Sequence, residues 1–198
     1  MKSFFLATAV FAISISAFGQ LSKSTWLIGG NGSFYSYSED YSTPNYNQTA
    51  KIINVDVTAS FGYFIVDKFA VGVRPYLSTY KSKVTSTSVG VGAPTYGFQI
   101  ALGPFVRYYF LEKEKPFNIL ADVSYQLGIN KFQVTPTQKG EFNTFCFMGG
   151  TAIFFNSTAS IEILLGYKQQ IETLTSAYNR NKKGIQASIG FTLHLEKL

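Results

Sequence analysis

The sequence predicts an all-β fold, an eight-stranded antiparallel up-and-down β-barrel of the transmembrane kind. Three observations support this prediction: apolar residues alternate with polar or small ones in many stretches, the connections between those stretches are alternately long and short, and charge is scarce. Charged residues make up 14% of the chain and aromatic residues 17%, whereas soluble proteins typically carry about 25% charged residues. This composition is expected when one whole surface faces lipid.

The last stretch, 185–195, shows the alternation most clearly. Its odd positions are apolar, as at Ile185, Ile189 and Phe191, and its even positions are polar or small, as at Ser188 and Thr192. Successive side chains of a strand point to opposite faces, and small uncharged residues suit a crowded barrel interior. About 9 to 11 tilted residues cross a bilayer. The stretch therefore predicts a membrane-spanning strand that closes the barrel.

Eight segments with this period-two pattern are expected to form the strands. They are 25–37, 52–65, 69–81, 96–110, 117–131, 142–154, 159–171 and 185–195. The sixth leaves its orientation open, because Phe145 and Phe147 compete with Phe142 and Met148 for the lipid-facing side. Pro75 and Pro104 fall inside the third and fourth segments, where each removes a ladder hydrogen bond, and they predict bulges or kinks.

The connections between these segments differ in length. Four are long, at 38–51, 82–95, 132–141 and 172–183, and three are short, at 66–68, 111–116 and 155–158. Short periplasmic turns alternating with long extracellular loops are typical of outer-membrane barrels. An even number of strands would place both chain ends on the periplasmic side.

Aromatic residues gather beside the short connections. They are Tyr63, Phe64, Phe69, Tyr108, Tyr109, Phe110, Phe117, Phe154 and Phe155. Aromatic girdles mark the two interfaces of a membrane barrel. We therefore expect these side chains to form the girdle at the periplasmic interface.

Residues 1–19 have the pattern of a secretory signal peptide. Lys2 precedes an apolar run over 4–15, and small residues follow at Ala17 and Gly19, which is the arrangement that signal peptidase removes. No later stretch offers 18 consecutive apolar residues for a transmembrane helix. We expect the remainder, 20–198, to be a single outer-membrane β-barrel domain in the bacterial outer membrane.

The sequence offers no pattern for catalysis, for a metal or for a cofactor. His194 is the only histidine and Cys146 the only cysteine, so neither a Ser-His arrangement nor a set of metal ligands with suitable spacing can be assembled. We expect His194 to be an interfacial or lumenal hydrogen-bonding residue and Cys146 a small apolar strand residue. The basic residues are scattered, which argues against nucleic acid as a partner. The chain is therefore predicted not to be an enzyme.

Four charged residues of inward orientation lie at similar heights above the short connections. They are Arg74, Arg107, Asp122 and Glu162. Arg107 and Asp122 are expected to be near-diagonal neighbours across adjacent strands. One interpretation is a buried ion-pair layer that fills a lumen only wide enough for side chains. The other is a gate that breaks to open a narrow pore. The first is favoured because charges so far from water must be paired in any case.

The stretch 103–110, Gly-Pro-Phe-Val-Arg-Tyr-Tyr-Phe, is followed by a charged turn. It resembles the small outer-membrane β-barrel family common in Bacteroidetes, which is loosely akin to OmpX and the opacity-type adhesins. The resemblance implies the barrel fold over the whole exported chain. It implies little about function, because one fold hosts many functions.

Two functions are compatible with these patterns. The favoured one is a non-enzymatic barrel that serves as a structural envelope component or displays its long loops as an adhesion or recognition surface. Loops 38–51 and 172–183 are rich in Tyr, Ser, Thr and Asn, a composition that suits adaptable contacts with extracellular ligands. The alternative is a narrow channel or transporter for small or apolar solutes, OmpW-like or porin-like. The expected partners are outer-membrane lipids and the barrel assembly machinery, and no cofactor is expected.

Overall fold

The computed structural model describes residues 21–43, 46–86, 90–91, 93–112, 115–133, 138–175 and 178–196. The expected signal peptide lies outside the described residues. Within the described part of the chain, no helix is both long enough and apolar enough to cross a membrane.

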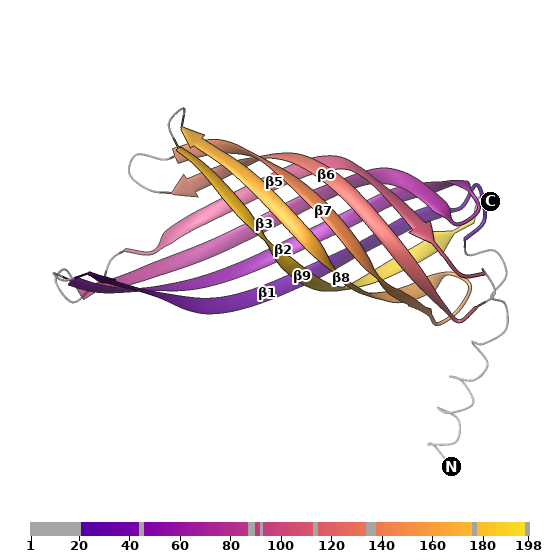
Figure 1. The fold of residues 1–198 in the computed structure, drawn as a ribbon, viewed down its shortest axis with the longest axis horizontal. Helices are drawn as coiled ribbons and strands as arrows, with labels where there is room; N and C mark the ends of the chain where they lie inside the picture. Colours follow the sequence, from indigo (N-terminus) through magenta and orange to yellow (C-terminus); the bar gives the residue numbers. More distant parts are fainter. Residues whose placement is uncertain are drawn as a thin grey trace, which may run out of the picture.

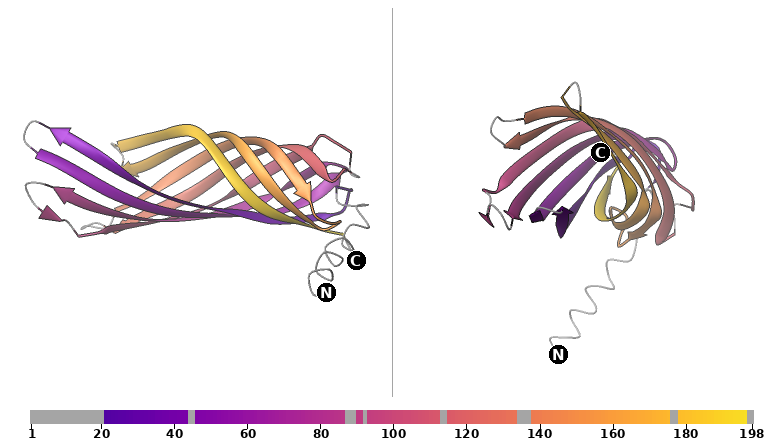
Figure 2. Two further views of the ribbon diagram at one scale, coloured as in Figure 1. Left: turned by 90° about the horizontal axis from the view of Figure 1, so that it is seen from below. Right: turned by 60° about the vertical axis from the view of Figure 1, so that its left-hand side comes forward.

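Eight long strands and one very short strand make up the described part of the chain (Figure 1). Their bounds are β1 Trp26–Thr43, β2 Tyr46–Val66, β3 Phe69–Ser86, β4 Gly90–Val91, β5 Thr95–Tyr109, β6 Phe117–Gln133, β7 Gln138–Phe154, β8 Ala159–Thr175 and β9 Tyr178–Leu195. The long strands pair antiparallel in the order β2-β1-β9-β8-β7-β6-β5-β3, and a further pairing of β2 with β3 closes the circle. Figure 2 shows these strands wrapped around one axis. The predicted eight-stranded antiparallel barrel is confirmed.

All four of the expected long loops are more than half strand. β1 and β2 leave only residues 44–45 between them, and β8 and β9 leave only 176–177, where loops 38–51 and 172–183 were expected. Backbone pairing continues through these hairpins. In the first hairpin, for example, it runs from the pair of Ser38 with Lys51 to the turn. In these extensions most residues on both faces of the strands are polar, so the apolar alternation ends while backbone pairing continues. The three short connections lie where the sequence predicts them, to within a residue.

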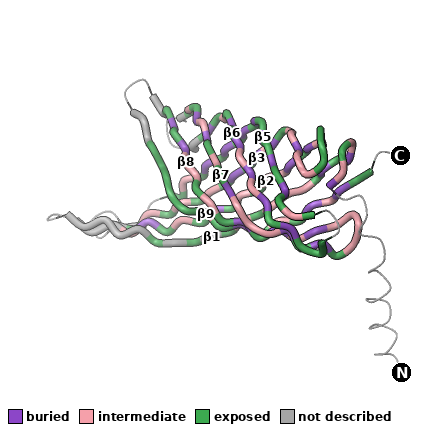
Figure 3. Tube along the Cα trace, turned by 45° about the vertical axis from the view of Figure 1, so that its right-hand side comes forward, coloured by how far each residue is buried: buried purple, intermediate pink, exposed green. Residues whose placement is uncertain are grey.

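Buried and exposed residues alternate along the strands (Figure 3). In β5 the pattern is uninterrupted from Gly97 to Tyr109, and large apolar side chains are exposed on every long strand. The orientation of β7, left open by the sequence, is now settled: Phe145 and Phe147 face outward, and Phe142 and Met148 face the lumen. The outer surface is therefore an apolar belt and the lumen holds the polar side chains.

Neither proline produces a bulge. Pro75 pairs with Leu102 and Pro104 with Val73, in a β3–β5 register that runs unbroken from Phe69 to Ser82. On the other side of each proline the pairing with the neighbouring strand is interrupted. This strand is β2 for Pro75 and β6 for Pro104, and in both cases the pairing resumes in the same register. A missing N–H removes one hydrogen bond, and here the neighbouring bonds keep the strands aligned.

The wall closes unevenly between the first and last strands. Trp26 to Asn31 of β1 pair with Gly190 to Leu195 of β9, and the pairing between these strands stops there. Beyond this point β1 pairs with β2 and β9 with β8, and Figure 1 shows the two hairpins ending far apart. The end of the barrel with the three short turns, called the short-turn end, is fully closed by backbone pairing. The other end is called the hairpin end.

Candidate functional site

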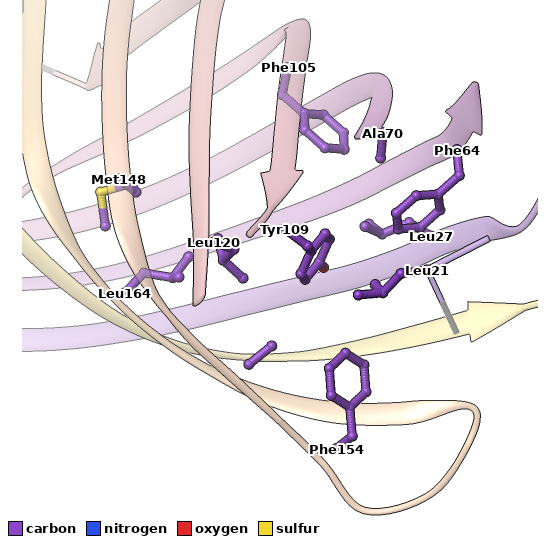
Figure 4. Packing of buried hydrophobic residues seen from close by; sticks show 11 residues of the cluster. Leu21, Leu27, Phe64, Ala70, Phe105, Tyr109, Leu120, Met148, Phe154 and Leu164 are labelled. Atoms are coloured by element: carbon purple, nitrogen blue, oxygen red, sulfur yellow. The ribbon is translucent and has the colours of Figure 1, made fainter. Parts of the chain in front are cut away.

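The lumen at the short-turn end is filled by a cluster of apolar side chains, called the apolar plug (Figure 4). Its buried members are Leu21, Leu27, Phe64, Ala70, Phe105, Tyr109, Leu120, Met148, Ala152, Phe154 and Leu164. Phe64, Tyr109 and Phe154 were expected beside the short turns in the interfacial girdle, and this expectation is wrong for them, although the inward parity of Tyr109 in its strand is confirmed. They occupy inward positions of their strands, where an eight-stranded barrel needs bulky side chains to fill its interior. Tyr108 and Phe110 do face outward.

A short segment before β1, residues 21–25, folds across the short-turn end. Leu21 is fully buried in the apolar plug, and its carbonyl oxygen accepts a hydrogen bond from the backbone N–H of Lys68 at 2.8 Å. The backbone N–H of Ser24 donates to the carbonyl oxygen of Phe64 at 2.9 Å, and that of Lys23 donates to Oδ1 of Asp67 at 2.7 Å. The segment therefore anchors an additional apolar side chain in the plug. Sequence reasoning missed Leu21 because it belongs to no alternating stretch.

His194 lies inside the plug and is 2% exposed. Its ring centroid is 5.3 Å from that of Phe154 and 5.9 Å from that of Phe64, and its Nε2 lies 3.4 Å from the hydroxyl of Tyr109. The residue is lumenal, one of the two positions that the sequence allowed. In the described part of the chain, no group of three or more His, Cys, Asp or Glu side chains is arranged to hold a metal ion. His194 thus has the surroundings of a packing residue.

The four charged residues singled out in the sequence meet directly above the plug. Oδ1 of Asp122 lies 2.6 Å from a terminal nitrogen of Arg74, and Oδ2 of Asp122 lies 2.9 Å from Nε of Arg107. A terminal nitrogen of Arg107 lies 2.7 Å from Oε1 of Glu162. All four side chains are buried. We call them the ion-pair layer. Arg107 and Asp122 stand directly opposite each other across β5 and β6, not diagonally as expected.

Further contacts fix this layer in place. Nε of Arg74 donates to the hydroxyl of Ser60 at 3.0 Å, and the Arg74 guanidinium lies 4.4 Å from the centroid of the Phe105 ring. Arg107 also contacts the hydroxyl of Tyr109 at 3.3 Å, which joins the layer to the plug. Two guanidinium groups and two carboxylates balance in charge. Buried ions are tolerated only when paired and hydrogen-bonded in this way. The layer and the plug together fill the lumen toward the short-turn end.

On the hairpin side of the layer the lumen contains a cavity of about 340 Å³, called the polar cavity. Asn54, Tyr76, Gln99, Lys168 and Gln170 are among the inward residues that line it. A smaller cavity of about 50 Å³ lies between it and the ion-pair layer, and both Tyr76 and Lys168 line the two cavities. The lumen thus changes from apolar at the short-turn end to polar toward the hairpin end.

A second charged group lies beside the polar cavity, where the lining residues Gln99, Gln170 and Lys182 contact Glu172. Oε1 of Glu172 accepts hydrogen bonds from Gln170 at 2.7 Å, from Gln99 at 3.2 Å and from Nζ of Lys182 at 2.7 Å. Sequence reasoning missed Glu172 and Lys182 because both fall in the expected loop 172–183. The signal that could have revealed Glu172 is the inward parity of Lys168 and Gln170, which continues to position 172 without interruption.

Asp56 lies on another wall of the polar cavity. Its carboxylate accepts hydrogen bonds from Asn54 at 2.6 Å, from the hydroxyl of Tyr76 at 3.1 Å and from that of Ser33 at 3.4 Å. These three neutral donors solvate the Asp56 charge within the protein. Together with the Glu172 group, they make the cavity a charged and strongly hydrogen-bonding environment.

Comparison with known proteins extends the description of the fold. No protein-family model matches the sequence, and no curated protein matches it. Among solved structures, the outer membrane protein OprG from Pseudomonas aeruginosa is similar with a TM-score of 0.54 and 13% identity, over 89% of this chain and 98% of that one. The N-terminal β-barrel domain of Pseudomonas aeruginosa OprF has a TM-score of 0.43 and 9% identity, over 87% of this chain and 98% of that one. The likeness to OprG shows that the chain has the fold of an outer-membrane β-barrel.

Proposed function

We propose that the protein is a non-enzymatic barrel of the bacterial outer membrane whose lumen is closed to solutes. The observation that carries this proposal is the charge-balanced contact of Arg74, Arg107, Asp122 and Glu162 directly above the apolar plug. An eight-stranded barrel has an interior only just wide enough for side chains. Two successive barriers, one ionic and one apolar, leave a solute no continuous path of water.

The apolar outer belt supports a place in the membrane. Outward side chains such as Leu127, Leu165 and Ile189 are more than half exposed, which is unfavourable in water and favourable in hydrocarbon. Export with removal of residues 1–19 would bring the chain to this location. The short-turn end would then face the periplasm and the hairpin end the outside of the cell. Outer-membrane lipids and the barrel assembly machinery are the partners that such a barrel requires.

The hairpin end supports a role in recognition or in envelope structure. β1 and β2 continue past the last residue pair between β1 and β9 as a paired ribbon, and such a rigid ribbon could present side chains outside the membrane. Ordered strands lose less conformational entropy than flexible loops when a partner binds. Kinship with the Bacteroidetes barrels akin to OmpX and the opacity-type adhesins remains part of this proposal and rests on the motif over 103–110.

A second candidate is a narrow channel or transporter. The observation that favours it is the succession of the 340 Å³ and 50 Å³ cavities, which reach the ion-pair layer from the hairpin end. Arg74, Arg107 and Asp122 line the smaller cavity, so separation of these charges would extend the polar path toward the short-turn end. The apolar plug argues against this candidate because it would still obstruct the short-turn end.

Ion conductance of the purified protein in planar lipid bilayers separates the two candidates. A closed barrel passes no steady current, whereas a channel gives discrete steps that scale with salt concentration.

A further inference from the structure

Lys168 is a lumenal cation that no described carboxylate neutralises at contact distance. The two arginines of the ion-pair layer contact its two carboxylates, and Lys182 lies 2.7 Å from Glu172. The ammonium of Lys168 instead lies 4.9 Å from the centroid of the Tyr76 ring. Within the described part of the chain, no hydrogen bond or ion pair to it is formed. Its three N–H donors therefore have no acceptor among the described residues.

The position of Lys168 makes this unmet donor capacity available to a ligand. Lys168 projects inward from β8 and lines both the polar cavity and the smaller cavity beneath it. It is partly shielded from solvent, and an ammonium in such a place is costly unless an anion or hydrogen-bond acceptors meet it. The carboxylate of Asp56 accepts hydrogen bonds from three neutral donors and forms no ion pair with Lys168 at contact distance.

Gln186 provides a second unmet group in the same place. It lines both cavities, and its buried Oε1 has no hydrogen-bond partner among the described residues. On the neighbouring strand β9, Gln186 is opposite Gly166 and Lys168 is opposite Gly184, so Lys168 and Gln186 are diagonal neighbours of the same inward parity. A strong cationic donor and a free acceptor thus face one cavity side by side.

We propose that the polar cavity binds a small organic anion whose charged group contacts Nζ of Lys168. A hydroxyl or other donor of the ligand meets Oε1 of Gln186, and the ring of Tyr76 forms part of the wall along the ligand body. The cavity volume of about 340 Å³ is at the lower end of the range of about 300–1,000 Å³ typical of ligand pockets. This site goes beyond the closed-lumen proposal, because it requires neither conductance nor its absence.

Isothermal titration calorimetry of the purified barrel in a non-ionic detergent tests the proposal. The probe is 4-hydroxybenzoate, and 4-hydroxybenzamide serves as its neutral counterpart with the same ring and hydroxyl. We expect saturable binding of the acid with one site per chain and, because a hydrogen bond between charged groups is lost, binding of the amide that is about tenfold weaker or more. Absence of saturable acid binding, or equal affinities for acid and amide, would overturn the proposal.

Substitutions identify the residue responsible. Lys168→Gln is expected to lower the affinity for 4-hydroxybenzoate about tenfold or more, whereas Lys168→Arg keeps the charge and most of the affinity. Asp56→Asn removes a negative charge from the same cavity and should tighten binding. Lys131→Gln is the matched control, because Lys131 is exposed on the outward face of β6. Unchanged affinity in Lys168→Gln, or an equal loss in Lys131→Gln, would refute the assignment of the site.

The calorimetric result is distinguishable from the test of the closed lumen. The comparison of acid with amide uses the wild-type protein alone, so it holds even if Lys168→Gln fails to fold. A barrel that conducts ions and still discriminates acid from amide would refute the closed lumen and keep the anion site. A barrel that passes no ions and binds acid and amide equally would keep the closed lumen and refute the anion site.

Discussion

Asp122 joins both arginines of the lumen, and Arg107 stands directly opposite it on the adjacent strand. The 2.9 Å contact of Arg107 Nε with Oδ2 of Asp122 and the 2.6 Å contact of Arg74 with Oδ1 make one carboxylate the centre of the ion-pair layer. Arg107 then extends the layer to Glu162. Because all of these groups are buried, removing any one of them leaves the layer with an unbalanced charge.

Arg107→Ala should therefore destabilise the barrel strongly. It leaves Glu162 without its arginine and removes one of the two cations at Asp122, and breaking a buried pair typically costs about 3–5 kcal/mol. Lys131→Ala is the control, because an exposed position usually changes the free energy of unfolding by no more than about 0.5 kcal/mol. Urea unfolding in detergent, followed by tryptophan fluorescence, measures both. Equal midpoints would show that Arg107 does not hold a buried layer together.

Arg180, in the expected loop 172–183, would be a natural surface control by sequence alone. The structure places its backbone in β9 opposite Glu172, and its side chain lies outside the described residues. Lys131 replaces it here because its exposure on the outer face is established.

Leu21→Ala tests whether the segment before β1 belongs to the fold. A fully buried leucine replaced by alanine typically costs about 2–5 kcal/mol. Lys23→Ala changes an exposed side chain in the same segment and keeps the backbone donor that binds Asp67, so its effect should be small. The stability of both variants is measured by incubating them at increasing urea concentration and comparing the electrophoretic mobility of unheated and boiled samples. If Leu21→Ala behaved like Lys23→Ala, the plug would not include this segment.

Gly72→Ala tests the packing between β2, β3 and the plug. A Cβ atom at Gly72 would collide with the carbonyl oxygen of Phe61 and would lie 2.7 Å from the ring of Phe105. Overpacking of this kind typically costs about 1–3 kcal/mol. Gly184→Ala is the control, since a Cβ there has no other atom within 4 Å. Urea titration should give a lower free energy of unfolding for Gly72→Ala than for Gly184→Ala. Equal values would contradict the close packing.

The orientation in the membrane can be tested by cysteine labelling on intact cells of an expression host. In a Cys146→Ser background, Lys83→Cys places a thiol on an exposed strand position toward the hairpin end, and Lys115→Cys places one in an exposed short turn. A membrane-impermeant maleimide should modify the first on intact cells and the second only after lysis. The opposite order of labelling would reverse the proposed orientation.

Much of this architecture could be predicted from the sequence because a barrel wall with an apolar outer face imposes period two on each strand. Parity alone oriented Arg107 and Asp122 inward, and counting residues from the short turns placed them at one height. The same reasoning failed where two explanations share one pattern: Phe64 and Phe154 lie beside short turns, so they were assigned to a girdle although they fill the lumen.

Other features left no readable pattern. Leu21 is an isolated apolar residue whose burial depends on a turn with positive φ at Ser24. The strand continuations around Glu172 and Lys182 lie beyond the apolar belt, where both faces are polar, so their sequence looks like that of a loop. Part of the wall of the polar cavity comes from those continuations, so the cavity could not be predicted from the sequence.

The central claim is that the ion-pair layer and the apolar plug close the lumen, and single-channel recording in planar bilayers tests it most directly. A double variant, Asp122→Ala with Glu162→Ala, serves as the comparison: it leaves two arginines that repel each other and removes the Glu162 contact of Tyr109, so brief anion-preferring currents are expected. The wild-type protein should pass no steady current at any applied voltage. Large, steady conductance of the wild-type barrel would contradict the closed lumen and make the channel the better account.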